Sequence, residues 1–143
     1  QFNLGKMYRD GLGVTQDYKE AIKWFRLATD QGERNAQNNL GIMYRDGLGV
    51  PEDYKEAIKW FRLATDQGEK NAQTNLGKMY RDGLGVPQDY KEAYIWYSIA
   101  VASGQKSAIN AREGLRKFLS PRQLAEAQEE ATARIKQIEE RQK

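Results

Sequence analysis

The sequence contains no cysteine and no histidine among its 143 residues. The absence of cysteine excludes disulfides and thiolate metal sites, and the absence of histidine removes the commonest base at neutral pH and the commonest metal ligand. We therefore expect no metal, no cofactor and no catalytic residue. Paired carboxylates such as Glu52 and Asp53 do occur, but the backbone amides exposed at a helix start explain them without catalysis.

Long apolar runs are also missing, because no stretch approaches the roughly 20 residues that a helix needs to cross a bilayer. The segment from Gln1 to Gly5 lacks the features of a signal peptide. Gln1 is in register with Gln37 and Gln73, so the sequence opens inside a repeated unit. We expect a soluble protein, cytoplasmic or periplasmic, trimmed from a longer parent, with any native targeting segment outside this chain.

Neither sign of charge dominates, since 23 basic residues stand against 20 acidic ones and give a net charge of +3. Such an excess indicates a polyanionic partner only if the basic residues gather on one face. A single-stranded RNA-binding helical repeat is the alternative class, because its units also have about 35 residues. Acidic residues accompany the basic ones in every unit, and near-identical units would offer the same side chains to every base. We therefore expect no nucleic-acid partner.

What the sequence does contain is a repeat of 36 residues, marked by Gly5, Gly41 and Gly77. The block from Gly5 to Leu40 differs from the block from Gly41 to Leu76 at five positions, and the third copy drifts in its tail. Units of roughly 20 to 50 residues cannot bury an apolar face alone and must stack to form a core. The period therefore predicts stacked supersecondary units and a binding scaffold.

Each unit is predicted to hold two helices. In the middle unit we expect Asn35 to cap the first, helix A, which ends at Gly47 with Leu48 folding back on it. Asp53, followed three residues later by Glu56, predicts a capping box at the start of the second, helix B. The unit is thus a helical hairpin.

Gly41 lies in the middle of helix A, where glycine costs about 1 kcal/mol relative to alanine. Its recurrence in every unit suggests that two helices cross too closely there for a side chain. Trp24, Trp60 and Trp96 recur in helix B among apolar neighbours, so we expect them to pack in the core and not to stack on bases.

The third unit carries three short motifs at the spacing of the other two: Leu76-Gly77-Lys78-Met79-Tyr80, Gly83-Leu84-Gly85, and Ala93 with Trp96. Through these motifs residues 1 to 104 resemble the Sel-one-like repeat, a relative of the tetratricopeptide repeat. The resemblance implies a right-handed all-α solenoid of antiparallel helix pairs with the A helices on the concave side. It also implies a non-catalytic adaptor for protein complexes, as in bacterial signalling, envelope and host-interaction systems or in eukaryotic quality control.

The resemblance and the composition together divide the chain into a repeat solenoid over 1–119 and a C-terminal capping helix over 120–143. Within the solenoid we expect units at about 1–34, 35–70 and 71–106, and a degenerate last helix over 107–119. Some members of the family tie each repeat with a disulfide, which this chain cannot form.

A helices that line an inner wall leave one face of each helix outside the core, with side chains spaced four and three apart. The nine candidate partner-binding residues on this face are Phe2, Lys6 and Arg9, Asn38, Ile42 and Arg45, and Thr74, Lys78 and Arg81. Arginine offers carboxylates a planar fork and is frequent in interface hot spots. We therefore expect a protein or peptide partner, and an acidic segment would suit this face.

The alternative is that each arginine of this face pairs with the acid that follows it, Asp10, Asp46 or Asp82, and only keeps the helix end polar. Asn39 recurs beside the apolar face. We expect its amide to bond a neighbouring helix or loop backbone, and we leave it out of the site.

The end of the chain departs from the repeat. The degenerate helix over 107–119 keeps Ala108, Leu115 and Phe118 as apolar positions. Ser120, with proline next and glutamine three residues on, then predicts a new helix with a capping box. An apolar stripe runs along that helix through Leu124, Ala127, Ala131, Ile135 and Ile138.

Two interpretations of the stripe stay open. In the first, the front half of the helix covers the open end of the stack, and the rear half, rich in Glu and Lys, is solvated. In the second, the stripe pairs with another chain, which would make a self-assembling repeat protein. We expect a monomer.

Overall fold

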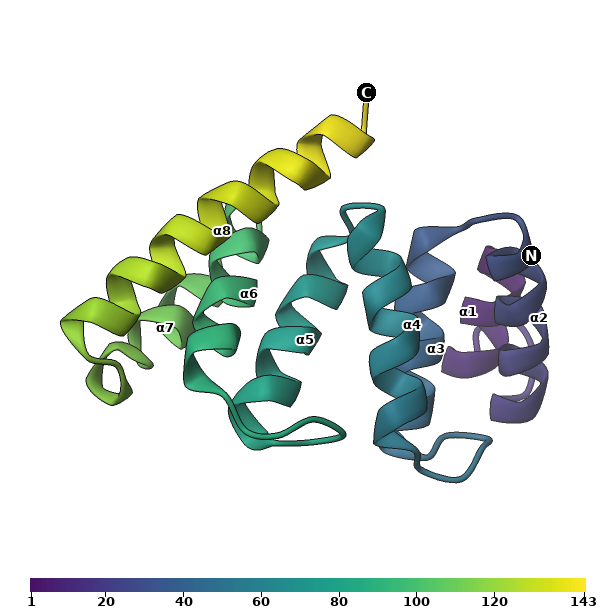
Figure 1. Cartoon of the computed structure of the whole chain (residues 1–143). Coiled ribbons are helices and arrows are strands. Elements are labelled where there is room, and N and C mark those ends of the chain that lie inside the picture. Colours follow the sequence, from purple (N-terminus) through teal and green to yellow (C-terminus); the bar gives the residue numbers. More distant parts are fainter. The chain divides into compact units, whose positions relative to one another are not determined.

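Helices are the only regular elements in the computed structural model, which describes residues 1–143 (Figure 1). They are α1 (Phe2–Asp10), α2 (Tyr18–Asp30), α3 (Arg34–Asp46), α4 (Tyr54–Asp66), α5 (Lys70–Asp82), α6 (Tyr90–Ala102), α7 (Ala108–Glu113), the 3₁₀ helix η1 (Arg116–Phe118) and α8 (Pro121–Arg141). The chain divides into two compact units, Gln1–Ala64 and Thr65–Lys143. The predicted all-α class is confirmed. None of the helices combines the length and the apolar character needed to span a membrane.

The core of the first unit is built from the stripes that helical periodicity places on α2 and α3. Its buried members are Ala21, Ile22, Phe25 and Ala28 on α2, and Ala36, Leu40 and Met43 on α3. Full burial of a leucine or phenylalanine side chain stabilises the fold by about 1.5–3 kcal/mol. Trp60 of α4 is half-buried and packs against this cluster. The indole nitrogen of Trp24 is buried as well, so the expected packing role of the tryptophans holds.

The recurring mid-helix glycine marks a close crossing of helices A and B, as predicted. A Cβ on Gly41 would lie 2.5 Å from the ring of Phe61, and a Cβ on Gly5 would lie 2.5 Å from the ring of Phe25. Real Cβ atoms do not approach a ring this closely, so only glycine fits without displacement of the aromatic side chain. The intrinsic helix cost of glycine is thereby offset by the packing of a large ring.

The A helices end as the sequence predicts. Gly47 adopts φ 68°, the left-handed conformation that favours glycine, and its N–H donates to the carbonyl of Met43. Leu48 donates to the same carbonyl over 2.9 Å and packs against the core. This stop is repeated at Gly11 and at Gly83.

The starts of the helices confirm one prediction and correct two. Asp53 caps α4 by accepting a 3.0 Å bond from the N–H of Glu56. In a capping box the side chain of Glu56 would accept a bond from the N–H of Asp53. Here that N–H donates instead to the carbonyl of Tyr44 at 2.8 Å. Asn35 does not cap helix A: α3 begins at Arg34, and the carboxylate of Glu33 accepts from the N–H of Asn35. The longer glutamate side chain performs the task that we assigned to asparagine.

The second unit pairs α5 with α6 by the same close crossing, since a Cβ on Gly77 would lie 2.6 Å from the ring of Tyr97. Its core extends from α6 into α7 and α8. The buried members on α6 are Ala93, Tyr94, Ile95, Tyr97, Ile99 and Ala100, joined by Ala108, Leu115, Ala127, Ala131 and Ile138 from the rest of the unit. Unlike α2 and α4, helix α6 is therefore buried on more than one side.

The predicted single helix over 107–119 is wrong in its extent. Helix α7 ends at Glu113, Gly114 follows, and a 3₁₀ turn takes over from Arg116 to Phe118. Ala108 and Leu115 are buried as expected, but Phe118 is 49% exposed and stacks on Tyr90 with ring centroids 4.4 Å apart. The segment is as long as the A helices, but its helix is interrupted at Gly114 and continues as the 3₁₀ turn.

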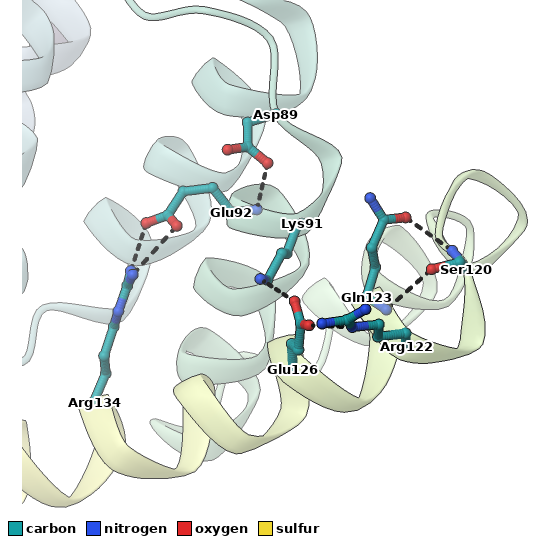
Figure 2. Close-up of polar contacts among 8 residues, drawn as sticks. All are labelled: Asp89, Lys91, Glu92, Ser120, Arg122, Gln123, Glu126 and Arg134. Atoms are coloured by element: carbon teal, nitrogen blue, oxygen red, sulfur yellow. Dashed lines mark hydrogen bonds and ion pairs between the residues drawn. The ribbon is translucent and has the colours of Figure 1, made fainter.

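Helix α8 starts at a full capping box, in which Ser120 and Gln123 exchange bonds of 2.9 and 3.1 Å with each other's backbone N–H (Figure 2). Its apolar stripe packs on α6. The rear half is not simply solvated, because Ile138 is buried and Arg141 pairs with Asp66 at 3.2 Å. Most of the stripe is thus covered within the chain by α6, while Leu124 and Ile135 stay partly exposed.

Ion pairs also join α8 to α6. Arg134 donates to both carboxylate oxygens of Glu92, the longer bond being 3.2 Å, and Lys91 bonds Glu126 at 2.7 Å (Figure 2). The guanidinium of Arg134 also lies 5.6 Å from the ring centroid of Trp96. Partly buried pairs that share partners in this way hold a helix in register better than isolated surface pairs do.

Candidate functional site

The nine candidate residues lie on α1, α3 and α5, where the sequence places them, but they differ in exposure. Lys6 and Lys78 are exposed, whereas Phe2, Arg9, Ile42, Arg45 and Arg81 are half-buried. Asn38 and Thr74 are only 6% and 8% exposed, and the hydroxyl of Thr74 donates to the carbonyl of Lys70. These two equivalent positions therefore present almost no surface to a partner.

The arginines are paired with the acids that follow them, as the alternative interpretation predicts. The Nε–Oδ1 distances are 2.7 Å in Arg9–Asp10, 2.8 Å in Arg45–Asp46 and 2.8 Å in Arg81–Asp82. Each pair has a second bond between Nη2 and the other carboxylate oxygen. The bidentate geometry occupies the Nε and Nη2 edge of each guanidinium, which is one of the two edges that can bind a ligand carboxylate.

Two of these pairs, Arg9–Asp10 and Arg81–Asp82, shift the pKa values of their members. The hydrogen bond from Arg9 lowers the pKa of Asp10, and the hydrogen bond from Arg81 lowers the pKa of Asp82. The acids in turn raise the pKa of Arg9 and Arg81 by the same hydrogen bonds. Both partners of these two pairs therefore stay charged near neutral pH, and each aspartate offsets much of the positive charge of its arginine.

Arg9 has a further role inside the first unit. Its Nη1 donates to the amide oxygen of Asn39, which joins α1 to α3, and its guanidinium lies 6.0 Å from the ring centroid of Phe25. The amide nitrogen of Asn39 donates to the carbonyl of Asn35 over 2.8 Å. Asn39 is thus engaged within the chain, as predicted, although one partner is a side chain and the other is its own helix.

Tyr97 is a neighbour of this face that the sequence analysis missed. It replaces the phenylalanine found at the equivalent positions, Phe25 and Phe61, and its ring packs on Gly77 in the same way. Its hydroxyl is buried with no hydrogen-bond partner. Burial raises the pKa of Tyr97, opposed by the nearby positive charge of Arg81. The phenylalanine-to-tyrosine change in the repeat alignment was the available signal.

Pairs of antiparallel helices that cross closely at a glycine and are joined by a glycine-containing loop are the mark of a helical-repeat protein. A sequence model of the Sel1 repeat matches residues 1–33, 34–69 and 70–105, and the chain belongs to this family. The resemblance to the Sel-one-like repeat and the solenoid class it implies are confirmed. No curated protein matches the chain.

Two solved structures are similar to it. The Sel1 repeat protein from Oxalobacter formigenes is 44% identical, with a TM-score of 0.71 over 74% of this chain and 43% of that protein. The protective antigen c5321 of uropathogenic Escherichia coli strains, which displays an SLR fold, is also 44% identical, with a TM-score of 0.72. That match covers 75% of this chain and 23% of c5321. The chain thus spans less than half the length of either.

Proposed function

We propose that the chain is a non-catalytic scaffold that binds a peptide or protein segment on the expected concave face, which the A helices α1, α3 and α5 line. Membership of the Sel1 repeat family supports this proposal, because helical repeats of this kind generally serve protein interaction. The site consists of the face named above without its two buried members: Phe2, Lys6, Arg9, Ile42, Arg45, Lys78 and Arg81.

One observation carries the proposal. The position directly after the crossing glycine holds Lys6, Ile42 and Lys78 in the three units, and it is one of the five that differ between the first two. The two lysines are exposed and Ile42 is half-buried, although their glycine neighbours are fully enclosed. The packing of the hairpin therefore does not dictate this side chain. A surface position that varies on a fixed scaffold is where binding chemistry can differ from unit to unit.

The same contacts refine the ligand. Because each of the three guanidinium groups is already paired with an aspartate, a partner gains little binding free energy by offering one carboxylate to each arginine. Lys6 lies 5.5 Å from the ring centroid of Phe2 and keeps its ammonium group at the surface. The face therefore suits a segment that places a carboxylate at a lysine and an apolar side chain against Ile42. This is an acidic peptide with an apolar anchor.

Selection from a random peptide library on the intact chain tests the proposal. A selected peptide should bind the K6E/K78E variant about tenfold more weakly, since two charge-assisted contacts become repulsive. The matched control is K23E/K59E, which makes the same charge change at equivalent exposed positions of α2 and α4. Equal loss in both variants would reduce the effect to net charge and reject the face. Circular dichroism of both variants confirms that the fold is kept.

A further inference from the structure

An open cavity of about 370 Å³ lies between α6, α7 and α8, within the second unit. Tyr94, Ser98, Val101 and Ala102 line it from one face of α6, and Ala131, Thr132 and Ile135 line it from one face of α8. Arg112 and Arg116 border it from α7 and η1. None of these residues belongs to the A-helix face, so the cavity is a separate feature of the capping segment.

The cavity combines an apolar floor with an excess of positive charge at its border. Arg112 and Arg116 both pair with the single carboxylate of Glu113, the first at 3.0 Å. Both pairs use the Nε atoms, and the only other bond is a long one of 3.5 Å from Nη2 of Arg116 to the hydroxyl of Tyr94. A guanidinium has five N–H donors. Two arginines with one acid therefore leave a net positive charge and several donors at the border.

The sequence of α6 is changed where it forms this floor. In the repeat register, Ser98 and Ala102 stand where α4 has Arg62 and Asp66, and Val101 stands where it has Thr65. Charged and polar groups are thus replaced by small and apolar ones along one side of the helix. Packing of α8 explains part of this change, since Ala131 is buried there. The packing of α8 does not account for the open cavity that remains beside Arg112 and Arg116.

We propose that this cavity binds a partner polypeptide through an acidic residue followed by an apolar one. The carboxylate would bond the Nη groups of Arg112 and Arg116, and the apolar side chain would lie on Val101 and Ile135. The cavity is open to solvent, so an extended chain can enter and leave it. Ser98, Gln128 and Thr132 at its margin offer hydrogen-bond groups to the peptide backbone. This site is independent of the function proposed for the A helices.

Titration of the ¹⁵N-labelled intact chain with the capped peptide acetyl-Gly-Glu-Leu-Gly-amide, followed by NMR, tests the proposal. Saturable shift changes are expected at the amides of α6 and α8 that border the cavity and at the Nε–H signals of both arginines. The R112Q/R116Q variant should weaken binding about tenfold, because the charge-assisted bonds are lost. The control R122Q removes a charge from a side chain that is 90% exposed on α8 and lies outside the cavity, and it should leave binding within twofold.

A second variant keeps every charge and fills the space. Thr132 is exposed at the margin, so T132W should be tolerated by the fold and should block the peptide. Three results would overturn the proposal. One is equal binding of the peptide in which glutamine replaces glutamate. Another is the same shift pattern with sodium acetate alone at equal concentration, which would reveal a simple anion site. The third is binding to T132W with unchanged affinity, which would place the peptide elsewhere.

Discussion

Gly41 of α3 and Phe61 of α4 are in such close contact that a Cβ on the glycine would lie 2.5 Å from the aromatic ring. The ring itself is fully buried. The same contact joins Gly5 to Phe25 in the first repeat and Gly77 to Tyr97 in the third repeat. This contact sets the spacing of each hairpin and fixes which side of helix A remains outside.

The G41A variant should therefore destabilise the protein, by about 1–3 kcal/mol, because an added methyl group must displace a packed ring. Urea denaturation with fluorescence detection measures the change. The control is G114A, since Gly114 has φ −63° and its nearest neighbours to a Cβ are at 3.4 Å. There the substitution should be neutral or slightly stabilising. A G41A protein as stable as wild type would contradict the close crossing.

The R134A variant should loosen α8 from α6. It removes both bonds to Glu92 and the contact with Trp96, for an expected loss of about 1–2 kcal/mol. Hydrogen exchange of the α8 amides should speed up more than that of the α5 amides. R122A is the matched control, because its side chain is 90% exposed, and it should change stability by less than about 0.5 kcal/mol. Equal exchange in the two variants would show that the stripe alone holds the helix.

The Y97F variant should stabilise the chain by about 1 kcal/mol, because it removes a buried hydroxyl that has no partner and restores the residue of the other units. Thermal denaturation shows whether the melting temperature of the variant rises, as expected, or falls. Y94F is the comparison, since the hydroxyl of Tyr94 accepts long bonds from Arg116 and Gln128. That variant should be neutral or destabilising. A loss of stability in Y97F would mean that the hydroxyl makes a contact in solution.

The Arg81–Asp82 pair should contribute its full stabilisation above about pH 4 and progressively less below it. Its hydrogen bond lowers the pKa of Asp82 below the ordinary 3.8, so the unfolded chain takes up the proton first as the pH falls. The contribution is thus present at neutral pH and is lost as the pH drops through the lower, folded-state value. D82N should cost up to about 0.5 kcal/mol at pH 7, because the pair is partly exposed, and less at pH 2. An equal loss of stability at both pH values would show that the negative charge of Asp82 makes no contribution.

Much of the fold follows from the sequence because its signals are local and repeated. Gly47 and Asp53 each act through the backbone or through a neighbour a few residues away, so spacing alone identifies them. Gly41 acts through Phe61 of the next helix, and its recurrence at the repeat period identifies it. The error at Asn35 has a physical cause: an asparagine is the better cap in general, but the helix begins earlier, and the side chain of Glu33 accepts from the N–H of Asn35 itself. Rankings of residues by N-cap propensity do not take the length of the side chain into account.

The candidate site was less predictable. Spacing places Asn38 and Ile42 on one face, but it does not reveal that the first is buried and the second half-exposed, because that depends on the neighbouring helices. The fork between Arg45 and Asp46 was foreseeable, since the residues are adjacent. The cavity beneath Arg112 was not foreseeable, because it depends on how α6, α7 and α8 pack against one another.

The most direct measurement is to map by NMR where a library-selected peptide touches the isotopically labelled chain. Intensity changes transferred from the peptide should fall on the side chains of Lys6, Ile42 and Lys78, and the exposed lysines of α2 and α4 should be unaffected. Transfer confined to the B helices, or to α8 alone, would contradict the proposal that the A helices carry the partner.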